Sequence, residues 1–277
     1  MQTPPPEHAR FLHAWVGGVL LAGLVLALSG CDQSGAPNPR FAPADPAPPS
    51  AVSRDSALAL LAAMRRTPFD SAFVALGRYT VTRQLRTERF DTTGAVAARR
   101  SYTLRYPPGA EKATLVSEDS SGALQQGGVL ADLAPDSSPR SRPPDLAAEV
   151  LPDQPPYLAP RTQEDFRFAV HADTVDEDRP VRIVTVQARP DTGRDQSIRH
   201  ARLTLTRDTH TLIELRVVRA SRGILFREDS RLLIELQRAP DDAAWVPRRT
   251  RFRMRIDIPF RAPQHFRTVS TYTDYQS

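Results

Sequence analysis

The sequence contains one cysteine, Cys31, among its 277 residues. No intramolecular disulfide can form, so the folded part has to be stabilised by its hydrophobic core. Lysine is equally scarce, since Lys112 is the single example, and the formal net charge of +5 is carried almost wholly by arginine. We attribute this arginine bias to the base composition of the genome. A nucleic-acid partner is not expected, because the sequence has no zinc-finger, homeodomain or RNA-recognition pattern.

Motifs that identify enzymes and metal sites are absent as well. The sequence has no GxSxG nucleophile motif and no glycine-rich phosphate loop. The histidines beyond the N-terminal segment stand singly, without the spacing of a metal site. An Asp-Thr-Gly triplet at 191–193 matches that of aspartic proteases, but it stands in a polar stretch where Asp and Gly favour a turn. We therefore expect no enzyme, catalytic residue, metal or cofactor, while a catalytic triad assembled only in space stays an open alternative.

The N-terminal segment reads as an export signal. Residues 11–29 form an apolar run that follows Arg10 and ends in small residues, which is the layout of a secretory signal. The closing Leu28-Ser29-Gly30-Cys31 resembles the lipobox of bacterial lipoproteins. This resemblance implies cleavage before Cys31 and modification of that residue with acyl chains such as palmitate, and two or three chains give stable anchoring. The alternative is an uncleaved transmembrane anchor, because the apolar run is about long enough to span a bilayer.

Three segments follow from this interpretation. Residues 1–30 are the signal peptide, 31–52 carry the lipidated cysteine and a Pro/Ala-rich tether, and 53–277 form a single domain. The tether is expected to be a semi-extended spacer, because its prolines interrupt helices and strands. We expect a protein of the bacterial cell envelope that is anchored to the outer or inner membrane and faces the periplasm. Asp32 directly follows the lipobox cysteine, and in enteric bacteria an aspartate at that position retains a lipoprotein in the inner membrane. Other phyla do not follow this rule, so the choice of membrane stays open.

The domain is predicted to begin with a helix at 55–66 that Pro68 ends, and to continue mainly as strands. Turns are predicted at 91–94 and 119–122, where Asp and Gly bracket polar residues. Residues 245–260 alternate with a period of two, which is typical of an antiparallel sheet with one wet face. One predicted face carries Val246, Phe252, Met254, Ile256 and Ile258, and the other carries Arg249, Arg251, Arg253, Arg255 and Asp257.

Residues 129–162 interrupt the strands with a proline-rich insert. Within it, residues 145–151 could form two turns of helix. A long segment without strands inside a compact domain is usually a lid, plug or mobile loop. We therefore predict that the insert gates a binding site.

This layout is similar to the LolA/LolB-like superfamily of lipoprotein carriers and receptors. The resemblance is carried by the helix at 55–66, the hairpin at 79–106, the insert with LPDQPPYLAPR at 151–161, and the closing strands from Trp245 onward. It implies an α+β, mostly β fold: a curved antiparallel sheet that forms an open half-barrel, with an N-terminal helix and a helical or loop insert. It also implies an apolar cavity that holds acyl chains, although a soluble carrier of that family has no lipobox.

From this resemblance we expect an exported, membrane-anchored lipoprotein that binds a hydrophobic ligand, either lipid or an acylated lipoprotein, without catalysis. The alternative is an envelope structural or sensory module that binds a protein partner and no lipid. The arginine row within 248–255 could contact anionic lipid headgroups or an acidic protein, but we favour a solvated outer face. The expected cavity lining consists of Tyr102, Leu104, Phe252, Met254 and Ile256, although for any single one of them we favour plain core. Nothing in the sequence fixes the oligomeric state.

Overall fold

The structure is a computed structural model that describes residues 54–124, 140, 155–171, 173–176, 179–190, 197–222, 227–260 and 262–277. The signal peptide, Cys31, the tether and the Asp-Thr-Gly triplet lie outside the described residues. Of the insert, only residues 140 and 155–162 are described, so the helix expected at 145–151 and the gating role stay predictions.

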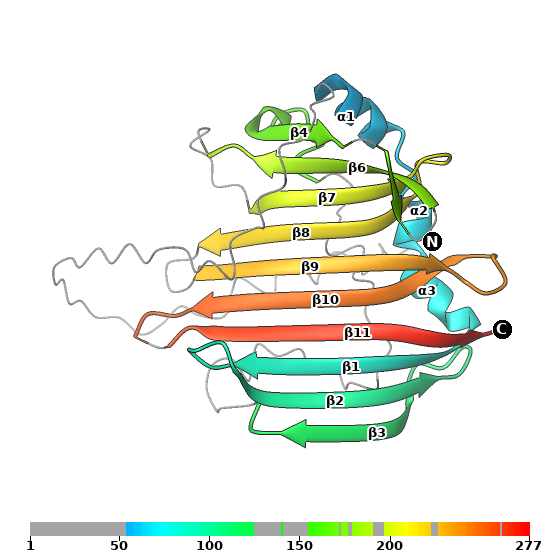
Figure 1. Cartoon of the computed structure of the whole chain (residues 1–277), viewed down its shortest axis with the longest axis vertical. Coiled ribbons are helices and arrows are strands. Elements are labelled where there is room, and N and C mark those ends of the chain that lie inside the picture. The colour runs from blue at the N-terminus through cyan, green and yellow to red at the C-terminus, as the bar shows by residue number, and fades with distance from the viewer. Residues whose placement is uncertain are drawn as a thin grey trace, which may run out of the picture. The chain divides into compact units, whose positions relative to one another are not determined.

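Eleven strands form one antiparallel sheet, shown in Figure 1. Its order is β3-β2-β1-β11-β10-β9-β8-β7-β6-β4, and β5 pairs with β6. Within the described chain the end strands β3 and β4 do not pair with each other, so the sheet is not closed into a barrel. This confirms the expected class of a mostly β protein with one open antiparallel sheet. The strands are β1 (Thr80–Phe90), β2 (Val96–Tyr106), β3 (Thr114–Ser121), β4 (Phe166–Val170), β5 (Thr174–Asp176), β6 (Arg179–Ala188), β7 (Ile198–Thr206), β8 (Leu212–Arg222), β9 (Arg227–Arg238), β10 (Trp245–Asp257) and β11 (Gln264–Gln276).

Short helices precede the sheet: α1 (Arg54–Ala62), α2 (Thr67–Asp70), α3 (Ala72–Ala75) and the 3-10 turn η2 (Leu76–Arg78), with a further turn η3 (Gln163–Asp165) before β4. The predicted N-terminal helix is present as α1, but it ends at Ala62 and not at residue 66. Pro68 lies in the first turn of α2. Proline is tolerated there because the first helical N–H groups have no intrahelical partner. Figure 1 shows α1 beside β4, and α2 and α3 along one end of the strands.

The two faces of the sheet differ in what covers them. Directly paired residues of antiparallel strands have their side chains on the same face. The face that we call the inner face packs against the helices, and its core joins Leu61 and Phe73 of the helices to Val184, Leu203 and Leu215 of the strands. The opposite, outer face carries most of the strand arginines.

Strand β10 departs from the strict alternation that the sequence predicts. Its register with β9 shifts between Pro247 and Arg249, which marks a β-bulge. An extra residue reverses which side chains face the core. Val246 is nevertheless fully buried and belongs to the core, whereas Ile258 lies beyond the end of the strand. From Thr250 to Asp257 the alternation holds as predicted.

Of the two predicted turns, only the first is confirmed in full. At 91–94, the Asp91 carboxylate accepts bonds from the backbone N–H groups of Thr93 and Ala95, both at 2.9 Å, and Gly94 adopts φ 83°. At 119–122, the first three residues continue β3, and only Gly122 adopts a turn conformation, with φ 68°. A Cβ at Gly122 would lie 2.4 Å from the carbonyl oxygen of Ala97, so a side chain cannot be accommodated there.

Candidate functional site: the inner face of the sheet

Burial changes along the inner face from one end of the strands to the other. At the helical end, Leu203, Leu215 and Ile234 are fully buried. Toward the other end, Phe252 is 37% exposed, and its partner Leu232 on β9 is half-buried. The row of Phe252 and Leu232 continues in Val217 on β8 and Ala201 on β7, and both of these are buried. Apolar side chains past the helices are therefore partly exposed on β1, β2 and β9 to β11 but not on β7 and β8.

We call these partly exposed side chains the inner patch. The register of neighbouring strands places them opposite each other in pairs, which are Tyr102 with Leu85, Phe252 with Leu232, and Met254 with Phe266. They come from strands far apart in the sequence that become neighbours because β11 inserts between β1 and β10. The inner patch consists of Leu85, Tyr102, Leu232, Phe252, Met254 and Phe266.

All five residues predicted to line a cavity lie on the inner face, as the register shows. Three of them, Tyr102, Phe252 and Met254, belong to the inner patch. Leu104 is fully buried within the core, and Ile256, at 9% exposure, borders the patch. The structure therefore brings the five to one face and divides them between core and surface.

A basic side chain lies among these apolar residues. Arg83 is paired in register with both Leu104 and Tyr272 on the inner face. Its Nε and Nη2 donate to Ser270 Oγ at 3.2 and 3.0 Å, and its guanidinium lies 5.8 Å from the centroid of the Tyr272 ring. These partners are neutral, so they leave the positive charge uncompensated. An arginine held in this way can donate to a carbonyl, ester or phosphate oxygen of a ligand.

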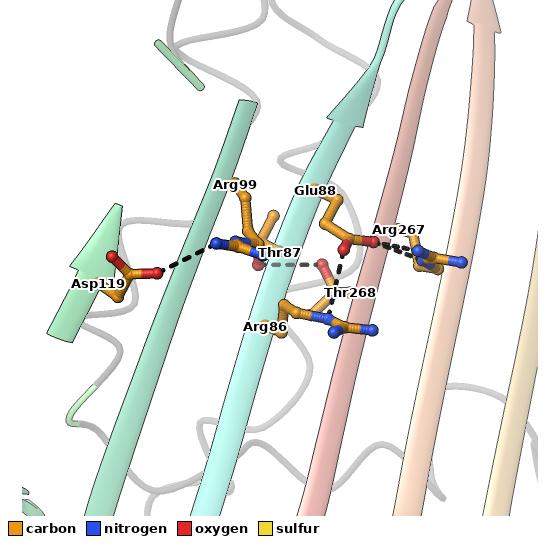
Figure 2. Close-up of polar contacts among 7 residues, drawn as sticks. All are labelled: Arg86, Thr87, Glu88, Arg99, Asp119, Arg267 and Thr268. Atoms are coloured by element: carbon orange, nitrogen blue, oxygen red, sulfur yellow. Dashed lines mark hydrogen bonds and ion pairs between the residues drawn. The ribbon is translucent and has the colours of Figure 1, made fainter. Parts of the chain in front are cut away.

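Charged side chains and hydroxyl groups supply the other polar groups of this region. Arg89 is paired in register with Phe266, and Glu118 with Tyr102. Thr87 and Thr268 face each other across β1 and β11, and their Oγ1 atoms lie 3.3 Å apart (Figure 2). Thr268 is also paired with Phe252. The inner patch is therefore apolar and bordered by hydroxyl groups and a few charged side chains, which suits a ligand with a long apolar part and a polar group.

Sequence reasoning missed four residues of this site, which are Arg83, Leu85, Leu232 and Phe266. Arg83 could have been found, because it falls between Val81 and Leu85 in the alternating pattern of β1. Phe266 has no local signal, because its proximity to Met254 depends on the pairing of β10 with β11.

Apart from the inner patch, a hollow with a volume of about 330 Å³ lies at the helical end of the sheet. It is lined by Val74 of α3, Arg78 and Arg238, and by Trp245, whose ring centroid lies 4.6 Å from the guanidinium of Arg238. No carboxylate or histidine is among the described residues that line it. This hollow therefore offers no general acid or base.

Of the described histidines, His171 and His200 lie near each other. His171 Nε2 lies 3.2 Å from Thr185 Oγ1, and burial lowers the pKa of His200, which the nearby positive charge of Arg202 lowers further. In the part of the chain that the structure describes, no group of three or more His, Cys, Asp or Glu could hold a metal ion. Within the same residues, no helix has the length and apolar character needed to cross a membrane. The expectation of no catalysis stays a prediction.

Comparison with known proteins finds no matching protein-family model and no matching curated protein. Solved structures do match. A LolA superfamily protein from Nitrosomonas europaea shares 10% identity at a TM-score of 0.24, over 82% of this chain and 94% of that one. An outer membrane lipoprotein-sorting protein domain from Vibrio parahaemolyticus shares 12% identity at a TM-score of 0.29, over 80% and 92%. A DUF1329 family protein from Desulfovibrio piger shares 10% identity at a TM-score of 0.28, over 80% and 92%.

At these identities and TM-scores the matches carry no argument, so the function of this chain has to follow from its own side chains.

Proposed function

We propose that this domain binds a hydrophobic ligand, either a lipid or the acylated end of another lipoprotein, on the inner patch without catalysis. The observation that carries the proposal is the change in burial along the inner face, where apolar side chains continue past the helices. Covering the exposed 37% of Phe252 would remove about 70 Å² from water, if its full area is about 200 Å². At about 25 cal/mol per Å², this contributes about 2 kcal/mol.

The ligand would lie along the patch with its polar group near Arg83. Each methylene that leaves water contributes about 0.8 kcal/mol, so a chain of several carbons binds measurably on apolar contact alone. The Arg83 guanidinium, held by neutral hydroxyl groups, supports orientation of an ester or carboxylate oxygen at the buried side of the patch.

We further propose that the protein carries out this binding at the bacterial envelope, anchored through a lipidated Cys31 and facing the periplasm. The support is the lipobox in the sequence. The 129–162 insert would act as the gate of the site.

The test starts from residues 51–277, expressed without the lipobox and purified without detergent. Solvent extraction followed by mass spectrometry identifies co-purifying lipids, and native mass spectra give the stoichiometry. We expect a stoichiometric acyl ligand that is lost in Phe252→Asp. The matched control is Val175→Asp, because Val175 is 66% exposed on strand β5, outside the patch. An empty, stable protein that ignores added lipid would refute the proposal and favour the module that binds a protein partner.

A further inference from the structure

The outer face carries a band of arginines in two neighbouring rows. In the first row, Arg231, Arg253 and Arg267 stand abreast on β9, β10 and β11. In the second row, Arg251 of β10 lies between Leu233 and Val269. We call the whole set the arginine band: Arg86, Arg99, Arg202, Arg216, Arg231, Arg251, Arg253 and Arg267.

Acidic side chains compensate only part of this charge. Within the two rows as far as the structure describes them, the acids are Glu88, which is 4% exposed, and Asp119, which lies at the sheet edge opposite Ser101. Glu88 pairs with both Arg267 and Arg86, the latter at 3.3 Å (Figure 2). Asp119 at the sheet edge pairs with Arg99 at 3.3 Å, and Glu214 pairs with Arg216 at 2.7 Å. Two arginines therefore share the Glu88 carboxylate, Asp119 lies at the edge of the second row, and Glu214 lies outside the rows.

The centre of the band is the least compensated part. Within the described chain, Arg251 and Arg253 form no ion pair, and the Nε atom of each is buried without a hydrogen-bond partner. Burial lowers the pKa of Arg253, and the positive charges of Arg267, Arg251 and Arg231 lower it further. Like charges directly opposite each other on neighbouring strands destabilise a sheet. An anion placed over this centre would relieve the repulsion between these charges.

Aliphatic side chains lie between the arginines. Leu233 and Val269 flank Arg251, and Val218 is paired with Arg231, all of them half-buried. The band crosses the strands from β7 to β2, which at about 4.8 Å per strand spacing is about 29 Å. A single small anion would contact only a small part of such an array of arginines. A bilayer surface presents many phosphates side by side, with apolar material directly beneath them.

We propose that the arginine band is a docking surface for the anionic phospholipid surface of a membrane. Guanidinium groups bind phosphate oxygens in a bidentate manner, and the aliphatic side chains between them meet the interfacial layer. Each arginine held near an anionic membrane strengthens binding about fivefold. The docking face is the one opposite the inner patch, so it leaves the proposed ligand site facing away from the bilayer.

The reach of the chain keeps the domain close to such a surface. From Cys31 to Arg54 the chain spans at most about 80 Å, at about 3.4 Å per residue. This estimate of reach rests on the proposed anchor at Cys31, whereas the charge of the arginine band does not depend on that anchor. The band would then fix the orientation of a domain that the anchor holds near the membrane.

The test uses residues 32–277, since the core cluster lies wholly within residues 57–275 and loses nothing by this truncation. The protein is floated with vesicles of phosphatidylcholine alone or mixed in equal parts with phosphatidylglycerol. The test variant is Arg251→Gln/Arg253→Gln. The matched control is Arg54→Gln/Arg167→Gln, which removes the same charge from exposed positions outside the band. A charge-preserving Arg251→Lys/Arg253→Lys variant and a thermal melt separate loss of charge from loss of fold.

We expect binding to the mixed vesicles only, weakened by salt, and about 30-fold weaker in the band variant than in the control. Inorganic phosphate and polyglutamate are added as competitors. The proposal would be overturned by equal binding to neutral vesicles or by no binding to either kind of vesicle. It would also be overturned by binding to polyglutamate without binding to vesicles, which would indicate an acidic protein partner. Phe252→Asp is expected to leave vesicle binding unchanged, so failure here is distinguishable from failure of the inner patch.

Discussion

Replacing Glu88 by alanine tests the charge balance of the outer face most sharply. The Glu88 carboxylate is buried and pairs with Arg267, which donates from Nε to Oε2 at 2.6 Å, and with Arg86. The Arg267 side chain is 25% exposed and that of Arg86 is 50% exposed, so only Arg267 would be left as a largely buried, uncompensated charge. Removing one partner of a buried ion pair costs about 3–5 kcal/mol. Because the site is partly open to water, we expect about 3 kcal/mol.

The assay is urea unfolding combined with a thermal melt. For a domain of this size, about 3 kcal/mol corresponds to a fall in Tm of about 6–12 °C. The matched control is Glu118→Ala, because Glu118 pairs with Arg100 at 3.7 Å and both side chains are exposed. Exposed pairs contribute about 0–1 kcal/mol. If Glu88→Ala costs no more than Glu118→Ala, the reasoning about the band is refuted.

Three further outcomes are expected. Leu104→Ala should destabilise the domain by about 2–5 kcal/mol in urea unfolding, because Leu104 is fully buried, and a loss below about 1 kcal/mol would contradict its assignment to the core. The folded pKa of His200 is lowered by burial and by Arg202, so its contribution to stability is present above the unfolded value of about 6.5 and is lost as pH falls below it. His200→Gln should therefore flatten the dependence of Tm on pH below about 6.5, and an unchanged slope would argue against the shift. Cys31→Ser should remove the lipid from the mature protein in intact-mass spectra and release it from the detergent phase, whereas an unchanged mass and partition would show that Cys31 is not the anchor.

The strands could be predicted from the sequence because most of them alternate regularly over long stretches. Strand β11 is 13 residues long, so an error of a few residues at either end does not change its assignment as a strand. By contrast, β4 and β5 are short, and all of β5 is exposed, so no period could identify them. The four-residue helices α2 and α3 are equally too short for a helical period to show.

The candidate site was only partly predictable for a different reason. Alternation placed Phe252 and Met254 together because they share a strand. It could not place Phe266 or Leu232 beside them, since those contacts depend on which strands pair and in which register. Alternation also cannot separate core from surface on the same face. Leu104 and Tyr102 follow one pattern, yet only Leu104 is fully buried in the core, and Tyr102 packs partly exposed against it.

Photocrosslinking tests the central claim, that the inner patch holds an acyl chain, most directly. Residues 51–277 are mixed with a phospholipid that carries a photoactivatable group in its acyl chain, irradiated, digested and mapped by mass spectrometry. The account predicts labels on peptides that contain Met254 and Phe266, and the loss of these labels in Phe252→Asp but not in Val175→Asp. Labels confined to outer-face residues such as Leu233 and Val269, or no labels at all, would contradict it.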